Sequence, residues 1–145
     1  MNRALFRKIA VMLVFFAAGA AAFACEMAFR LEGQEYSTVE IHPGSAIKLV
    51  KGQSYKLTVE FIEDHRNCRV PACDTYFLLD NEKWKLKKES QGLIIKSMTE
   101  WDEKTQTKNS MVIEFTASVQ GVHELQIVRD CPKGGYNEKI SFSVE

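Results

Sequence analysis

The middle of the chain carries side chains that are common ligands of soft metals. His65, Cys68 and Cys73 are separated by two and by four residues, and Cys131 follows much later. Thiolate and imidazole groups bind copper or zinc. The paired CxxC motifs of zinc sites are missing, and residues 132–136 offer no second His and no Met to complete a blue-copper site. A copper or zinc site built from His65 and the cysteines is therefore the alternative hypothesis rather than the leading one.

Residues 1–24 have the pattern of a secretory signal peptide. This pattern matters for the cysteines, because the compartment decides whether they form disulfide bonds or stay reduced. Basic residues precede an uncharged apolar run at 9–24, which is shorter than the roughly 20 residues of a membrane-spanning helix and ends in small residues at Ala22 and Ala24. We expect cleavage before Cys25, with an uncleaved anchor as the alternative. Acylation of Cys25, as in a bacterial lipoprotein, is a second alternative, although the residues before it fit a lipobox poorly. We therefore expect an exported protein, periplasmic or extracellular, that meets a membrane only if Cys25 is lipidated.

Removal of residues 1–24 changes the charge balance. The full chain has 145 residues with 19 basic and 19 acidic side chains. Residues 1–24 contain three basic residues and no acidic one. Without them, 121 residues remain with 16 basic and 19 acidic side chains, which gives a net charge of −3. Such a chain lacks the positive field that attracts nucleic acid, and we expect no nucleic-acid partner. The hydrophobic fraction of 46% excludes a disordered chain. The length predicts a single domain at 25–145.

Alternation of apolar and polar residues predicts β-strands through most of this domain. The clearest period of two runs from Tyr55 to Phe61, and another runs from Met111 to Ala117. The polar segment 102–110 predicts a loop, and no window after the signal peptide shows a helical stripe. Short strands with turn signals every 8 to 14 residues predict an all-β fold, an antiparallel β-sandwich. Its architecture resembles immunoglobulin-like or cupredoxin-like sandwiches, a resemblance that names a fold and implies no function.

The strand order of such a sandwich would bring the cysteines together. In an immunoglobulin-like order the strand at 55–63 and the penultimate strand at 122–129 run in the same direction, and the first strand starts at the end where both of them finish. Four residues would then gather at this end: Cys25, Cys68, Cys73 and Cys131. In an oxidising compartment an even number of cysteines predicts disulfide bonds, here two.

Two disulfide pairings fit this arrangement. The preferred pairing joins Cys68 to Cys131 and Cys25 to Cys73. A second pairing, which joins Cys73 to Cys131 and Cys25 to Cys68, fits nearly as well. A bond between Cys68 and Cys73 would close only a small loop. A link from residue 68 to residue 131 would stabilise the domain by about 4 kcal/mol if it is unstrained.

Three other residues are weak binding candidates. Lys133 and Tyr136 lie in a glycine-containing loop between the last two strands, at the end where the cysteines are expected. Trp84 lies among lysines at 83, 85, 87 and 88, which could meet an anionic lipid or glycan surface. Lysines that alternate with apolar residues are also typical of an edge strand that avoids pairing with another sheet, and this second interpretation is favoured.

Signatures of catalysis are missing from the chain. It contains no Gly-x-Ser-x-Gly elbow, no HExxH motif and no glycine-rich phosphate loop after a strand, so we expect no enzyme. The sequence predicts an exported, disulfide-containing β-sandwich that acts as a non-enzymatic binding or structural interaction module through loops at its cysteine-rich end. Its partner would be a protein or another envelope component, and it would need no cofactor. The alternative is a periplasmic metal-binding or redox protein that uses His65 and the cysteines of the same end with copper or zinc.

Overall fold

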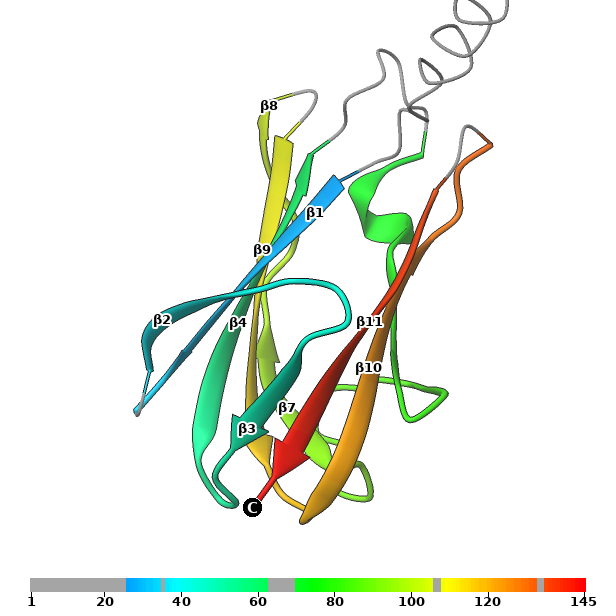
Figure 1. The fold of residues 1–145 in the computed structure, drawn as a ribbon. Helices are drawn as coiled ribbons and strands as arrows, with labels where there is room; N and C mark the ends of the chain where they lie inside the picture. Colours follow the sequence, from blue (N-terminus) through cyan, green and yellow to red (C-terminus); the bar gives the residue numbers. More distant parts are fainter. Residues whose placement is uncertain (1–25, 35, 63–69, 106–107, 133–134) are drawn as a thin grey trace, which may run out of the picture.

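The computed structural model describes residues 26–34, 36–62, 70–105, 108–132 and 135–145. Two β-sheets pack face to face in this part of the chain, and one short 3-10 helix, η1 (Ala72–Asp74), interrupts the strands (Figure 1). The expected all-β sandwich is confirmed. Within the described ranges, no helix has the length and apolar character needed to cross a membrane.

The first sheet has six strands. Five of them are hydrogen-bonded in the order β2, β1, β4, β9, β7, and β8 pairs with β9 on the same side as β7. All pairings in this sheet are antiparallel. The strands are β1 (Glu26–Gly33), β2 (Tyr36–Ile41), β4 (Ser54–Ile62), β7 (Leu93–Met98), β8 (Asp102–Thr105) and β9 (Lys108–Ala117).

The second sheet has five strands in the order β3, β11, β10, β5, β6. β3 pairs with β11 in parallel, and the other neighbours are antiparallel. The strands are β3 (Ala46–Leu49), β5 (Tyr76–Leu79), β6 (Glu82–Lys83), β10 (Gly121–Arg129) and β11 (Tyr136–Val144).

The strand order is that of an immunoglobulin-like sandwich. β1, β4, β9 and β7 follow the A-B-E-D order of one immunoglobulin sheet, and β5, β10 and β11 follow the C-F-G order of the other. After β2 the chain leaves the first sheet through a turn at Pro43 and Gly44, and β3 joins the second sheet beside β11. The sequences of β4 and β10 contain no cysteine, so the disulfide that joins the corresponding strands in antibody domains has no counterpart here.

The core between the sheets follows from the alternation of the strands. The odd-numbered side chains of β4 from Tyr55 to Phe61 are at most 3% exposed, whereas the side chains between them face outward. The Phe115 ring contacts rings from both sheets, with centroid distances of 5.7 Å to Tyr55, 5.5 Å to Trp84 and 5.9 Å to Phe142. These ring contacts join the two sheets in the centre of the core.

The prediction of a loop at 102–110 is wrong. β8 and the start of β9 form an antiparallel pair there, with Asp102 opposite Ser110. The polar composition of the segment gave no strand signal. An edge strand such as β8 is held by backbone hydrogen bonds to one neighbour and does not need an apolar face.

Candidate functional site

The end of the sandwich where β1 begins and β4 and β10 end is called here the cysteine-rich pole (Figure 1). Glu26, which follows Cys25 in the chain, lies opposite Ile62 at the end of β4. Arg129 at the end of β10 donates a hydrogen bond to the carbonyl oxygen of Val70, two residues after Cys68 in the sequence. The described segments that flank the cysteines therefore meet at one pole, as the strand argument predicts.

Of the predicted site residues, four lie outside the described ranges: Cys25, His65, Cys68 and Lys133. Cys73 is exposed in η1, and Cys131, partly buried, follows β10; no disulfide joins the two. The alternative pairing of Cys73 with Cys131 is thus not formed. The register that pairs Tyr76 with Val128 would place these cysteines opposite each other if it continued, but η1 turns the chain out of the ladder first. The preferred pairing has one partner of each bond outside the described ranges and stays a prediction.

The metal hypothesis depends on residues of the same pole. Among the residues that the structure describes, no three His, Cys, Asp or Glu side chains are grouped as a metal site. His65 and Cys68, on which the hypothesis rests, are not among them. A copper or zinc site therefore stays a hypothesis.

Trp84 was a weak binding candidate, and its position corrects that expectation. The side chain is 3% exposed, and the indole Nε1 donates a hydrogen bond of 2.7 Å to the carbonyl oxygen of Leu93. Trp84 belongs to the core and offers no ring to a lipid or glycan surface. Lys83 lies on β6, the outermost strand of its sheet, as the edge-strand interpretation predicts, whereas the lysines at 85, 87 and 88 follow the end of this two-residue strand.

Arg129 is a buried charge at the pole that the sequence reasoning missed. Its side chain is 2% exposed, and its guanidinium carbon lies 3.8 Å from the ring centroid of Phe61 on the opposite sheet. Nη1 lies 3.4 Å from Oγ1 of Thr75, and Nη2 donates to the carbonyl oxygen of Val70. The period of two that buries Leu125 and Ile127 also turns residue 129 inward, and this signal could have found it.

The charge of Arg129 has no acidic partner among the described residues. None of the ion pairs found there includes it, and its Nε is buried without a hydrogen-bond partner. A guanidinium group keeps its proton in proteins. The pole therefore contains a buried positive charge whose Nε has no hydrogen-bond partner among the described residues.

Tyr136, a predicted binding residue, lies directly across from Arg129 in the register of β10 and β11. Its half-buried ring packs against the core, with a centroid distance of 6.4 Å to Phe29. Its hydroxyl is buried and has no hydrogen-bond partner in the described part of the chain. Burial raises the pKa of the phenol well above the usual 10.0, and the negative charge of Glu138 raises this pKa further. Tyr136 thus offers a neutral O–H donor inside the pole rather than a surface ring.

Gly135 makes the turn before Tyr136 possible. Its φ is +62°, and a Cβ at this position would lie 2.6 Å from the carbonyl oxygen of Arg129. Any other residue would combine a strained backbone with a steric overlap. The glycine therefore allows β11 to start opposite the last residue of β10.

A second polar cluster lies at the opposite end of the sandwich. His123 is 9% exposed, with Nδ1 at 2.8 Å from Oδ2 of Asp80 and Nε2 at 2.8 Å from the carbonyl oxygen of Val119. Asp80 and Asn81, with φ of 52° and 66°, form the two-residue turn between β5 and β6, and Oδ1 of Asp80 accepts from the backbone N–H of Glu124. His123 is a structural residue, and each of its ring nitrogens lies at hydrogen-bond distance from an oxygen atom.

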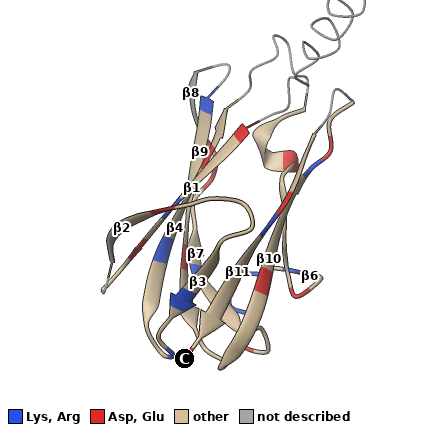
Figure 2. Cartoon of the chain, viewed as in Figure 1, with Lys and Arg blue, Asp and Glu red and all other residues tan. Residues whose placement is uncertain are grey.

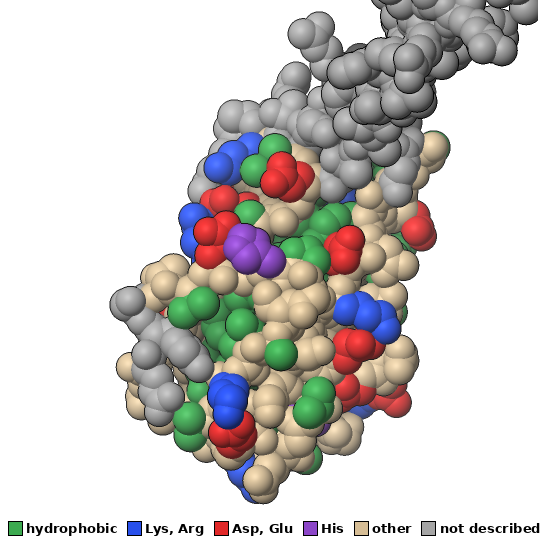
Figure 3. Space-filling view, in the orientation of Figure 1, with side chains coloured by type: hydrophobic (Ala, Val, Ile, Leu, Met, Phe, Trp, Pro, Cys, Tyr) green, Lys and Arg blue, Asp and Glu red, His purple; other side chains and the backbone are tan. Residues whose placement is uncertain are grey.

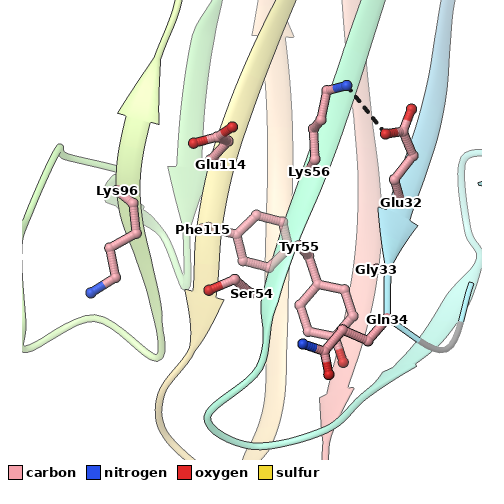
Figure 4. Close-up of a pocket in the computed structure, with 9 residues that line it drawn as sticks. All are labelled: Glu32, Gly33, Gln34, Ser54, Tyr55, Lys56, Lys96, Glu114 and Phe115. Atoms are coloured by element: carbon pink, nitrogen blue, oxygen red, sulfur yellow. Dashed lines mark hydrogen bonds and ion pairs between the residues drawn. The ribbon is translucent and has the colours of Figure 1, made fainter.

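An open pocket of about 580 Å³ lies on the outer face of the first sheet (Figure 4). Charges alternate across it, from Lys96 on β7 through Glu114 and Lys56 to Glu32 on β1. Nζ of Lys56 lies 3.2 Å from Oε2 of Glu32, and Glu114 accepts a hydrogen bond of 2.7 Å from Ser97. Charges of both signs are also interspersed elsewhere along the strands and on the molecular surface (Figures 2 and 3). Such compensated charge is typical of a solvated sheet face, so the cysteine-rich pole remains the candidate site.

No protein-family model matches this chain, and no curated protein matches it. Among solved structures, the solution structure of Amebosin is 15% identical, with 71% of this chain and 90% of that chain covered and a TM-score of 0.42. A chimeric titin Z1Z2 carrying a decorin peptide is 11% identical, with 81% and 96% covered and a TM-score of 0.38. Domains 4 and 5 of the S-layer protein SbsC are 11% identical, with 88% and 79% covered and a TM-score of 0.41. Similarity at this level says nothing about function, and the architecture rests on the strand order of this chain.

Proposed function

We propose that this chain is an exported, non-enzymatic binding or structural interaction module that contacts its partner through the loops at the cysteine-rich pole. The observation that carries the proposal is the convergence of four segments: the start of β1, the end of β4, residues 70–75 and the turn between β10 and β11. Loops held at one end of a rigid sandwich are a common place of recognition. The partner would be a protein or another component of the cell envelope.

An exposed aromatic side chain beside the pole supports this proposal. Tyr76 is 49% exposed on the outer face of β5 and pairs with Val128, three residues before Cys131. Tyrosine is enriched at protein interfaces, where it buries a large area at a low cost in side-chain entropy. The predicted disulfide bonds would hold the neighbouring loops in one conformation and so reduce the entropy lost on binding.

The test is capture of the partner from the native envelope fraction by the tagged full chain. The variant Tyr76→Ser removes the exposed ring beside the pole, and Val122→Ser is its matched control, because Val122 is 72% exposed near the start of β10, at the far end of the same sheet. We expect the wild-type chain and Val122→Ser to retain the same envelope component and Tyr76→Ser to lose it. Equal retention by both variants would contradict a contact at this pole.

Metal and thiol content measured on the same preparation distinguishes the alternative function. A binding module purified from its own compartment should carry no stoichiometric metal and no free thiols. Stoichiometric copper or zinc together with free thiols would replace the proposal with a metal-binding or redox role for His65 and the cysteines.

A further inference from the structure

The two unpartnered donors at the cysteine-rich pole lie on neighbouring positions. Arg129 is the last residue of β10 and Tyr136 the first of β11, and the two are directly opposite in the ladder. Both side chains turn inward, Arg129 onto Phe61 and Tyr136 toward Phe29. Among the residues that the structure describes, the Nε of one and the hydroxyl of the other are buried without a hydrogen-bond partner.

We propose that Arg129 and Tyr136 form a binding subsite for a carboxylate group inside the cysteine-rich pole. The inference deepens the proposed function, on which it rests for the identity of the partner, by naming the chemical group that the pole would recognise. The free Nε–H and O–H groups could each donate to one carboxylate oxygen, and a guanidinium group is the residue type that best matches a carboxylate.

The charge balance of the site favours an anion. A buried cation without an anion carries a desolvation penalty, which the ring of Phe61 and the carbonyl oxygen of Val70 offset only in part. A carboxylate would supply the missing negative charge where the local dielectric is low and the attraction is strong. The Nε–H group and the tyrosine hydroxyl can each donate to one of the two oxygens of a carboxylate.

Tyr136 would contribute as a neutral donor. Because burial keeps its hydroxyl protonated, the phenol donates to an anion instead of repelling it. The carboxylate could belong to a small organic acid or to an acidic side chain of a protein partner, and the two sources present the same chemistry to the subsite.

The experiment follows the Nε–H resonance of Arg129 by NMR in the full exported protein, assigned through its contact with the Phe61 ring. Titration with acetate should give a saturable shift of this resonance, and acetamide, which has the same shape without the charge, should give none. Tyr136→Phe should weaken acetate binding about tenfold or more, since it removes one hydrogen bond to a charged group. Val122→Ser changes an exposed side chain at the far end of β10 and should leave the affinity unchanged.

A blocked peptide that contains one glutamate, compared with its glutamine counterpart, distinguishes the two sources. Binding of the glutamate peptide at least as tight as that of acetate assigns the subsite to a protein side chain, and binding of acetate alone assigns it to a small acid.

No saturable shift, an equal shift with acetamide, or an unchanged affinity in Tyr136→Phe would overturn the subsite. A shift of the Arg129 Nε–H resonance in Glu63→Gln or Asp64→Asn without ligand would also overturn the proposal. It would mean that a carboxylate of the chain itself occupies the site. Partner capture that depends on Tyr76 but persists without acetate binding would leave the proposed function intact while rejecting the subsite.

Discussion

A β-carbon at Gly92 would lie 2.0 Å from Cε1 of His123, far inside van der Waals contact. The imidazole ring cannot move aside without breaking its hydrogen bonds to Asp80 and Val119, each 2.8 Å long. The carbonyl oxygen of Gly92 in turn accepts from the backbone N–H groups of Ser118 and Val119. The packing of a backbone against a ring thus fixes the loops at the end opposite the cysteine-rich pole.

The variant Gly92→Ala should lower the free energy of unfolding by about 3 kcal/mol, because the added methyl group overpacks a site that cannot expand. Chemical denaturation of the purified protein measures the loss. The penalty should shrink in a His123→Ala background, where the ring is gone. Gly44→Ala serves as the control: its φ of +78° makes alanine strained, but no atom lies near the new Cβ, so its penalty should be the same with or without His123. An undiminished Gly92→Ala penalty in the double variant would show that the ring is not the cause.

The variant Trp84→Phe should lower the free energy of unfolding by about 1–3 kcal/mol, because it removes the buried hydrogen bond from Nε1 to the carbonyl oxygen of Leu93. Thermal or denaturant unfolding measures the loss. Leu86→Ser is the matched control, since Leu86 is 55% exposed two residues away and its replacement should change stability by less than about 0.5 kcal/mol. Similar losses in both variants would argue against a structural role for the indole.

The stability of the domain should fall in alkaline solution in a way that depends on Tyr136. Its pKa is raised in the folded state above the usual 10.0, so the folded protein holds this proton more tightly than the unfolded chain does. The resulting stability is complete below about pH 10 and is lost as the pH rises above this value. We expect the free energy of unfolding to fall more steeply above pH 10 in the wild-type protein than in Tyr136→Phe, in denaturant titrations at a series of pH values. Parallel curves would show that the phenol is not buried.

The protein isolated from its own compartment should contain two disulfide bonds and no free thiol. We expect peptide mapping under non-reducing conditions to find Cys68 joined to Cys131 and Cys25 joined to Cys73. Reduction of the bond between residues 68 and 131 should lower stability by about 4 kcal/mol on the chain-entropy account. Four alkylatable thiols in the untreated protein would reject this prediction.

The sequence predicted the parts of the fold that depend on a periodic apolar face. In β4 and β10, buried side chains alternate with side chains that face outward. The expected strand order also predicted that both strands run toward the same pole. β8 was missed, because an edge strand needs backbone pairing and not an apolar pattern. Trp84 was misread because its neighbouring lysines suggested a surface, whereas the chain turns the indole inward after β6.

The sequence predicted where the candidate site lies but not which buried side chains line it. The gathering of the cysteine-flanking segments was predictable, since it needs only strand directions. The burial of Arg129 follows from the same alternation that buries Ile127, but a charged residue at a strand end is normally placed in solvent. That its Nε and the hydroxyl of Tyr136 lack partners depends on side-chain packing across two sheets, which no local pattern encodes.

The parallel pairing of β3 with β11 has a mechanical consequence. The two strands are paired from Ala46 opposite Ser141 to Leu49 opposite Val144, and an ion pair of 2.7 Å between Lys48 and Glu145 adds to the ladder. β1 begins at one end of the sandwich and β11 finishes at the other (Figure 1). A tension along the molecule therefore pulls β3 and β11 past each other and loads their hydrogen bonds in shear, all at the same time. Such a joint resists a pull better than a hairpin whose hydrogen bonds open one after another.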